Sequence, residues 1–468
     1  MSWYKMIFCF LLMQNVVNAQ DSLKTLHAEQ VLKIVQEFHP VVKLANLDVE
    51  RSSAEITVAR AAFDPVLSNY ISNKTFAGEN YYNYLNPNVS IPTWYGIEFF
   101  AGIENLSGNR FEPGETIGQT SYAGVSASLL KNLVIDKRRA YLQQAKLYKD
   151  MAVIEQQLIV NNILMDAMNA YWQWVYAYQN FLIVSRNAEV TNARLDLVKK
   201  AFINGERPAI DTLEAFAQVQ SFQFQQNEAQ LQFVNAGLAL STFLWKSSDE
   251  PYTLPMNIIP KDGWEQEALI RNDQINLQDL LNLAANSHPE LKLYDQKLDI
   301  LDIDKRLKFQ ELLPKLDVQY NLLNKGYYVF NNAAAVLDNN YQYGVKLEVP
   351  MRFSQGRGMY RQARLKIAQT KITRGQKFQL IEVKVKSYYN ELLNYRKQIA
   401  LQSNNYDNYK RLVTAEETKL MNGESSLFLV NSRETKALEA FLKLVELKTK
   451  YIRTIYALQW STGVIAIR

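Results

Sequence analysis

A run of 74 residues, from Lys131 to Asn204, contains neither Gly nor Pro, the residues that most disfavour a helix interior. A continuous helix of that length would measure roughly 110 Å, which exceeds the diameter of a compact domain. The run ends at Asn204-Gly205-Glu206, and a second long helical run ends at Asn422-Gly423-Glu424. Two long helices that each reverse at an Asn-Gly-Glu turn predict a tube or rod, and they argue against an enzyme core.

The N-terminus has the features of an export signal over residues 1–19. Lys5 precedes an apolar stretch, and a Val-Asn-Ala sequence ends before Gln20. Cys9 is the only cysteine, so we expect the mature chain to have neither thiols nor disulfides. No later segment offers eighteen consecutive apolar residues. An exported chain of this kind can therefore enter a membrane only as a β-barrel.

The chain repeats its own order of motifs. His39-Pro40 recurs as His288-Pro289, Pro65 recurs as Pro314, and the Asn-Gly-Glu turn occurs twice. These matches predict a duplicated unit, since order and spacing are both kept. We assign the two repeats and the Pro-rich linker between them to residues 20–249, 276–468 and 250–275.

Within each repeat the hydrophobic pattern changes in the same sequence. Helical spacing comes first, then strict alternation, and then helical spacing again over a long hairpin. The aromatic residues of the first long helix fall on two apolar stripes, which indicates packing against two neighbours. The predicted helices cover 25–38, 40–62, 276–287 and 289–312, and the long helical hairpins cover 132–247 and 358–462.

Four segments alternate apolar and polar residues over about 9–12 positions, which suits a strand between lipid and an aqueous lumen. A half-buried strand of a soluble sheet would alternate in the same way. Four strands cannot close a membrane barrel, whose minimum is about eight, so several chains would have to share one. The strands lie in β-hairpins at about 92–130 and 314–350. Residues 66–72 are a weaker candidate because their alternation fails at Asn69, and the role of residues 66–91 is left open.

The doubled arrangement resembles the TolC-type outer membrane efflux proteins. The likeness is carried by the two His-Pro segments, by the start of the long helix at 140–145, by the proline-led glycine-rich segment at 349–358, and by the two turns. The resemblance implies a homotrimer that is mainly α with membrane β. In it, four strands per chain form a 12-stranded β-barrel continuous with a long α-helical periplasmic barrel.

The resemblance also implies a function. The chain would be the exit duct of a tripartite efflux or type I secretion system in the outer membrane of a Gram-negative bacterium, with a large periplasmic portion. Its partners would be further copies of itself, outer membrane lipid, a periplasmic adaptor and an inner-membrane pump of the RND, ABC or MFS type. No enzyme activity, cofactor or nucleic acid is implied, and the transported substrate is left open.

The two turns are the candidate gate and adaptor-contact sites. We expect Arg207 and Asp211 to join polar contacts between tips in a closed state, or else only to cap a helix in solvent. Apolar residues follow the second turn where well-known members carry acidic ones, so Phe428 and Leu429 form an apolar constriction, pack internally, or contact the adaptor. The candidate residues are Asn204, Gly205, Glu206, Arg207, Asp211, Asn422, Gly423, Glu424, Phe428 and Leu429.

Two function classes follow from these patterns. The first is the membrane duct, and the second is a periplasmic coiled-coil scaffold or adaptor protein without a membrane barrel. The three histidines, His27, His39 and His288, form no metal motif. Two of them precede prolines at predicted helix starts, where we expect a capping or packing role. Charge does not favour nucleic acid, because 52 Lys and Arg against 47 Asp and Glu are spread along the chain.

Overall fold

The computed structural model describes residues 24–108, 116–264, 275–327, 340–463 and 465. The predicted signal peptide, residues 1–19, lies outside this range. The chain divides into two compact units. The first unit contains Met1–Lys43, Val160–Ala284 and Val383–Arg468, and the second contains Leu44–Ile159 and Ala285–Glu382.

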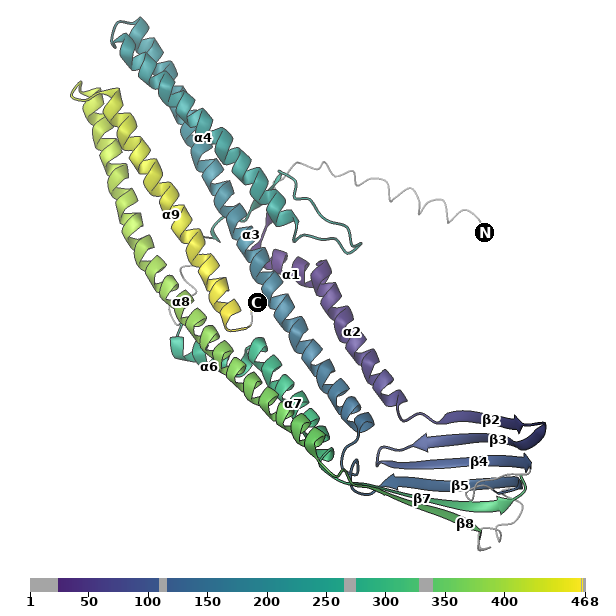
Figure 1. Cartoon of the computed structure of the whole chain (residues 1–468). Helices are drawn as coiled ribbons and strands as arrows, with labels where there is room; N and C mark the ends of the chain where they lie inside the picture. Colours follow the sequence, from purple (N-terminus) through teal and green to yellow (C-terminus); the bar gives the residue numbers. More distant parts are fainter. Residues whose placement is uncertain (1–23, 109–115, 265–274, 328–339, 464, 466–468) are drawn as a thin grey trace, which may run out of the picture. The chain divides into compact units, whose positions relative to one another are not determined.

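The helices occur in two series of matching lengths (Figure 1). The first series is α1 (Ala28–Phe38, 11 residues), α2 (Pro40–Ala61, 22 residues), α3 (Lys137–Ile203, 67 residues) and α4 (Ala209–Ser241, 33 residues). The second series is α6 (Leu277–Ser287, 11 residues), α7 (Pro289–Gln310, 22 residues), α8 (Ser354–Met421, 68 residues) and α9 (Leu427–Ser461, 35 residues). The short helices and both long hairpins therefore form where the hydrophobic period predicts them.

The core of the first unit is built from the long helices. One cluster contains Ile183 and Ala188 of α3, Phe222 of α4, and Leu438 and Val445 of α9. Elsewhere on α3, the predicted packing role of the aromatic residues is confirmed, since Tyr171, Trp172 and Trp174 are all buried. The helix thus contacts more than one neighbour, as its two stripes require.

A short parallel sheet corrects one prediction in this unit. Strand β1 (Lys24–Leu26) pairs with β6 (Ile258–Pro260) inside the predicted linker. Residues 25 and 26 are therefore extended and not helical, and the Leu26 carbonyl accepts a hydrogen bond from the Tyr171 hydroxyl at 3.0 Å. The short strand thereby connects the N-terminal segment to the long helix.

The second unit contains one antiparallel sheet with the order β2-β3-β4-β5-β7-β8 (Figure 1). This corrects the predicted four strands per chain, because the sheet has six. The two additional strands include the weaker candidate at 66–72 and most of the segment at 66–91 whose role was left open, and their many Asn, Tyr and Ser residues blur the apolar period. The strands are β2 (Val66–Phe76), β3 (Glu79–Pro92), β4 (Ile97–Gly108), β5 (Gly118–Ser128), β7 (Lys315–Lys325) and β8 (Tyr341–Glu348).

Among the described helices, none combines the length and the apolar character needed to cross a membrane.

The two His-Pro pairs begin equivalent helices. His39 Nδ1 accepts the Val41 amide at 3.2 Å, and His288 Nδ1 accepts the Glu290 amide at 3.2 Å. Each histidine is 7% exposed, and its ring satisfies one of the amides that a helix N-terminus leaves unpaired. Both histidines thus have the capping role that their position before proline predicts.

Burial gives His39 a pH dependence. Its ring lies 6.1 Å from the ring of Phe243, and burial lowers the pKa of His39 below its ordinary value, against a smaller opposing effect of a hydrogen bond with the Thr242 backbone. The unfolded chain therefore takes up the proton first as the pH falls. The neutral His39 ring makes its full contribution to stability above about pH 6.5, and this contribution is lost as the pH falls below that value.

We predict that His39→Asn flattens this dependence, because Asn keeps a capping acceptor and does not titrate. The measurement is the thermal midpoint at about pH 7.5 and about pH 5.5. Between these two pH values the thermal midpoint should fall further for the wild-type protein than for the variant. This holds even when the substitution lowers the midpoint at neutral pH. Equal losses for the two proteins would show that His39 is not responsible.

Candidate functional site

The register of the sheet collects apolar side chains on one face. Residues directly opposite each other on neighbouring strands share a face. The pairing Phe99–Val125–Tyr320–Tyr343 crosses four strands, and the row next to it on the same face is Ile97–Ala127–Val318–Val345. We call this the apolar sheet face; it is defined by Val89, Ile91, Ile97, Phe99, Ala101, Ala123, Val125, Ala127, Leu316, Val318, Tyr320, Leu322, Tyr341, Tyr343, Val345 and Leu347.

Large side chains of this face are open to solvent in the single chain. Tyr343 is 69% exposed, and Val345 and Leu347 are each 61% exposed. A shallow apolar depression lies on part of the face, lined in part by Ile91, Phe99 and Val125. A contiguous exposed apolar surface of this kind indicates contact with another protein or with a membrane.

The opposite face, which we call the polar sheet face, carries a network of hydrogen bonds. Tyr84 donates to Glu104 at 3.0 Å, and Tyr122 donates to Asn86 at 3.0 Å. Further along the sheet, Asn321 donates to Gln342 at 3.2 Å. Because this face carries carboxylate, amide and hydroxyl groups, which are costly to transfer to hydrocarbon, it suits water and not lipid.

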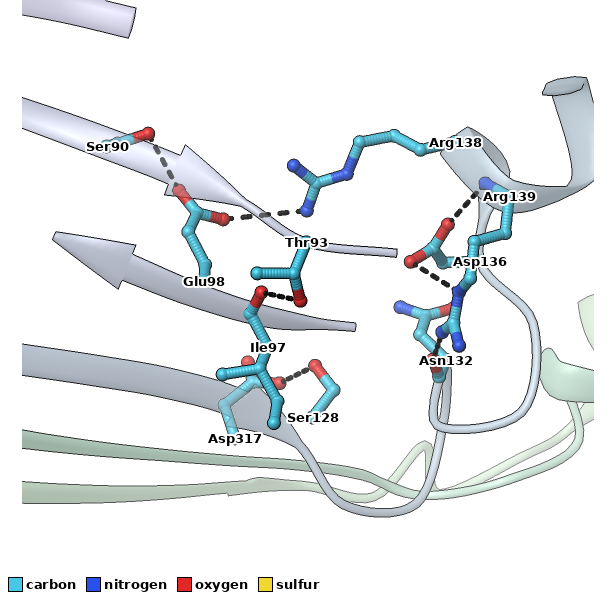
Figure 2. Close-up of polar contacts among 10 residues, drawn as sticks. All are labelled: Ser90, Thr93, Ile97, Glu98, Ser128, Asn132, Asp136, Arg138, Arg139 and Asp317. Atoms are coloured by element: carbon cyan, nitrogen blue, oxygen red, sulfur yellow. Dashed lines mark hydrogen bonds and ion pairs between the residues drawn. The ribbon is translucent and has the colours of Figure 1, made fainter. Parts of the chain in front are cut away.

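Polar contacts also connect the sheet to the start of α3 (Figure 2). Glu98 of β4 accepts from Ser90 of β3 at 3.0 Å and from Arg138 of α3 at 3.5 Å. Asp136 caps the helix, because its Oδ1 accepts the Arg139 amide at 2.8 Å and its Oδ2 accepts Arg139 Nε at 3.2 Å. These contacts hold the first turn of α3 against the sheet.

Polar contacts also join β5 to β7, and they join the loop after β5 to α7. Ser128 of β5 donates to Asp317 of β7 at 2.6 Å (Figure 2). Lys131 then pairs with Glu311 at 2.6 Å, and the Asn132 amide donates to Gln310 Oε1 at 3.1 Å. The loop between β5 and α3 is thereby attached to the C-terminal end of α7.

The two Asn-Gly-Glu turns have the same geometry. Gly205 has φ +76° and Gly423 has φ +78°. Glu206 donates its amide to the Ala201 carbonyl at 2.9 Å, and Glu424 donates to the Lys419 carbonyl at 2.9 Å. With the shorter-range bonds from each glycine amide, this is the Schellman arrangement that ends a helix with a left-handed residue.

The candidate residues of the first turn lie together. Arg207 Nη1 is 3.1 Å from Asp211 Oδ2, across one turn at the start of α4. Pro208 lies immediately before Ala209, the first residue of α4. The pair thus lies within one helix start of a single chain. A contact of these residues between copies stays a prediction.

Apolar residues of the second turn divide between two environments. Leu427 and Val430 are each 1% exposed, whereas Phe428 is 64% exposed and Leu429 is 42% exposed. Leu427 packs in a cluster with Leu195 of α3 and Val219 of α4. Internal packing is therefore not the role of Phe428 in this chain, and its exposure agrees with a contact surface.

A polar cluster near the two turns was not predicted from the sequence. Arg194 of α3 makes a two-pronged ion pair with Glu434 of α9, and its Nη2 lies 3.8 Å from Glu417 of α8. Asn431 of α9 donates to Glu214 of α4 at 3.4 Å. We call these five residues the tip network. It links all four long helices, and no local motif marks its members, which lie far apart in the sequence.

The surroundings of Arg194 stabilise its positively charged form. Its hydrogen bonds with Glu434 raise the pKa of the guanidinium above its ordinary value, although burial acts in the opposite direction. Arg194 and Glu434 are about four-fifths buried, so water screens this pair less than it screens a surface pair. Within the described residues, no group of three or more His, Cys, Asp or Glu is placed to hold a metal ion.

Several solved outer membrane proteins have structures similar to this chain. The chain is similar to the CmeC outer membrane channel of Campylobacter jejuni, with TM-score 0.63 and 14% identity over 93% of this chain and 85% of CmeC. It is similar to the outer membrane protein VceC of Vibrio cholerae, with TM-score 0.63 and 13% identity over 93% of this chain and 96% of VceC. The open-state MtrE outer membrane channel of Neisseria gonorrhoeae gives TM-score 0.64 and 12% identity over 93% of this chain and 88% of MtrE. No family model matches the sequence, and no curated protein matches it.

We predict that Glu434→Gln destabilises the protein by about 2 kcal/mol, because it leaves the buried Arg194 charge without its main partner. The control is Glu439→Gln on the same helix, whose partner Lys436 is 55% exposed. That exposed pair should contribute nothing measurable. The comparison is the urea midpoint of each variant in detergent. Equal midpoints for the two variants would contradict the assigned role of the tip network.

We predict that Gly423→Ala destabilises by roughly 1 kcal/mol, because a Cβ disfavours left-handed backbone. No atom lies within 4 Å of the added carbon, so the cost comes from the dihedral angle and not from a clash. Gly375→Ala within α8 also meets open space and has no positive φ, so it should stabilise by roughly 0.5–1 kcal/mol. A lower thermal midpoint for Gly423→Ala together with a higher one for Gly375→Ala would confirm the left-handed turn. Shifts of both midpoints in the same direction would contradict it.

Proposed function

We propose that this chain, which has the fold of the outer membrane channels, is itself an outer membrane channel that conducts substrates out of the cell. The observation that carries the proposal is the division of one sheet into an exposed apolar face and a hydrogen-bonded polar face. The apolar sheet face would lie against lipid, and the polar sheet face would line an aqueous pore.

Strand lengths agree with this assignment. A tilted transmembrane strand needs about 9–11 residues. Five strands of the sheet have 11 to 14 residues, and β8 has 8. Aromatic side chains also lie near the ends of strands, with Trp94 stacked 4.4 Å from Phe63 at the turn between β3 and β4. Aromatic residues are favoured at the boundary between lipid and water.

We further propose that the chain acts as a homotrimer with a helical periplasmic tube, as its resemblance to the TolC-type proteins implies. The partners would be a periplasmic adaptor and an inner-membrane pump of a tripartite efflux or type I secretion system. The exposed side chains of Phe428 and Leu429 beside the second turn support an adaptor contact there. The matching helix lengths support descent of the two halves from one duplicated unit.

The alternative function is a periplasmic coiled-coil scaffold with a soluble sheet. It is weaker, because nothing in the described part of the chain covers the apolar sheet face, and a water-soluble sheet would have to cover it. Fractionation separates the two proposals. A channel sediments with outer membrane and resists carbonate extraction, whereas a scaffold is released by carbonate.

We predict that Val345→Lys blocks insertion, because a lysine facing lipid near the bilayer centre costs roughly 2–4 kcal/mol. Gln342→Lys is the matched control, since residue 342 lies three positions away on the same strand and on the polar face. The control should insert at the wild-type level. The measurement is the carbonate-resistant fraction of each variant. Equal insertion of both variants would contradict the assignment of the faces.

A further inference from the structure

Positive charge is concentrated in one segment of the chain, although it is spread along most of the rest. Between Val349 and Ile381 the sequence has eight Lys and Arg residues and no Asp or Glu. This segment follows β8, the last strand of the sheet, and contains the first turns of α8. A group of cations without neighbouring acidic residues attracts an anionic partner.

Most of these cations have no acidic partner in the described part of the chain. Arg374 pairs with Asp295 of α7 at 2.6 Å, and Lys377 pairs with Glu290 of α7 at 3.6 Å. The other six are exposed, and their side chains make no ion pair with any residue that the structure describes. We call them the basic cluster: Arg352, Arg357, Arg361, Arg364, Lys366 and Lys371.

The start of the other long helix differs in this respect. There, Arg138 Nη2 lies 3.5 Å from Glu98, and Arg139 Nε lies 3.2 Å from Asp136 (Figure 2). Acidic residues of the same chain therefore compensate the arginines at the start of α3. The arginines at the start of α8 have no such compensation.

The basic cluster begins beside one end of the sheet, which we call the sheet base. Ser128 at the end of β5 lies opposite Asp317, and Glu348 at the end of β8 lies opposite Lys315, both near the start of β7. The two long helices therefore start at the same end of the sheet, as Figure 1 shows. If the apolar sheet face lies in lipid, as proposed above, the sheet base lies at the boundary between lipid and water.

Exposed apolar residues lead from the apolar sheet face to the basic cluster. Val345 and Leu347 of that face are followed, at the same two-residue interval, by Val349 and Met351, which are 52% and 100% exposed. Arg352 comes directly after them. Apolar residues followed at once by cations suit a segment that passes from hydrocarbon into phospholipid headgroups.

The geometry of α8 keeps the first arginines within reach of headgroup phosphates. The headgroup region is roughly 5–8 Å deep on each side of a bilayer. Arg352 precedes the helix, and Arg357 lies about 5 Å along it from Ser354. Side chains of a helix point toward its N-terminus, so Arg361, about 10 Å along, reaches back toward the sheet base. Lys371, at about 26 Å, lies too far away.

An anionic solute inside the pore is the alternative occupant. It is less favoured, because a segment that lines the pore would continue the polar sheet face. Val349 and Met351 instead continue the apolar sheet face up to the first arginine.

We propose that Arg352, Arg357 and Arg361 bind the phosphate groups of anionic phospholipids in the leaflet at the sheet base. A guanidinium group stays charged and binds phosphate through two parallel hydrogen bonds. Three such groups without acidic partners select anionic lipids over zwitterionic ones. This inference rests on the proposed membrane location.

Quenching by brominated lipids tests the lipid preference in the full chain. A fluorophore is attached at Met351→Cys, since the only native cysteine is Cys9 in the predicted signal peptide. The protein is reconstituted into vesicles of phosphatidylcholine and phosphatidylglycerol in equal parts, with one lipid or the other brominated. Brominated phosphatidylglycerol should quench more, with a local enrichment of roughly fivefold, the effect of one cation at a membrane surface. Equal quenching by the two lipids would overturn the proposal.

Substitution identifies the cations responsible for the preference. In a triple variant with Arg352→Gln, Arg357→Gln and Arg361→Gln, the two brominated lipids should quench the label equally. A preference that stays at the wild-type level in this variant would overturn the proposal.

The matched control removes the same charge further along α8. It combines Lys371→Gln, Lys410→Gln and Arg411→Gln, three residues that are also exposed. This variant should keep the wild-type preference for phosphatidylglycerol. Loss of the preference in the control would show that net charge, and not the position of the arginines, determines it, and would overturn the proposal.

Two further readouts separate this inference from the proposed function. If neither brominated lipid quenches the label at 351, the proposed membrane location fails and the inference fails with it. The anion-to-cation permeability ratio in a planar bilayer should be the same for the wild type and the triple arginine variant. A lower ratio in the variant, with equal quenching by both lipids in the wild type, would show that the arginines face the pore and would overturn the lipid site alone.

Discussion

The two-residue period of the strands, kept in register across the sheet, is the constraint on which the function depends. A shift by one residue in any pairing would move the apolar side chains of that strand to the polar face. Hydrogen bonds on the polar sheet face, such as Tyr122 to Asn86 and Asn321 to Gln342, oppose such a shift because they need this register. The register thereby gives one sheet two surfaces that suit two different solvents.

The helical part depends on a different balance. The 67-residue helix α3 is stabilised mainly by packing along its apolar stripes, as are most helices in proteins. The packing ends where the chain reverses, and there Gly205 and Gly423 terminate the helices through left-handed backbone. The tip network adds Arg194 and Glu434, a mostly buried ion pair that joins α3 to α9. Separation of these two helices at the tips would require breaking that pair.

Much of the fold could be predicted from the sequence because long helices have a strong period and few breakers. The His-Pro caps and the glycine turns were also recognisable, since their conformations depend on neighbouring residues alone. Strand β2 was only a weaker candidate over 66–72, and β3 was not predicted, because Asn69 and Asn83 interrupt the alternation. Their place is shown only by the pairing of β2 with β3 and of β3 with β4. The tip network was missed because Arg194 and Glu434 are 240 positions apart and meet only in three dimensions.

The most direct test of the account is the solvent that each face of the sheet contacts. A spin label at Val345→Cys and another at Gln342→Cys can be compared in reconstituted lipid, since the only native cysteine is Cys9 in the predicted signal peptide. We expect the label at 345 to be reached by oxygen dissolved in lipid, and the label at 342 to be reached by a water-soluble nickel chelate. Equal access of the chelate to both labels would contradict this expectation.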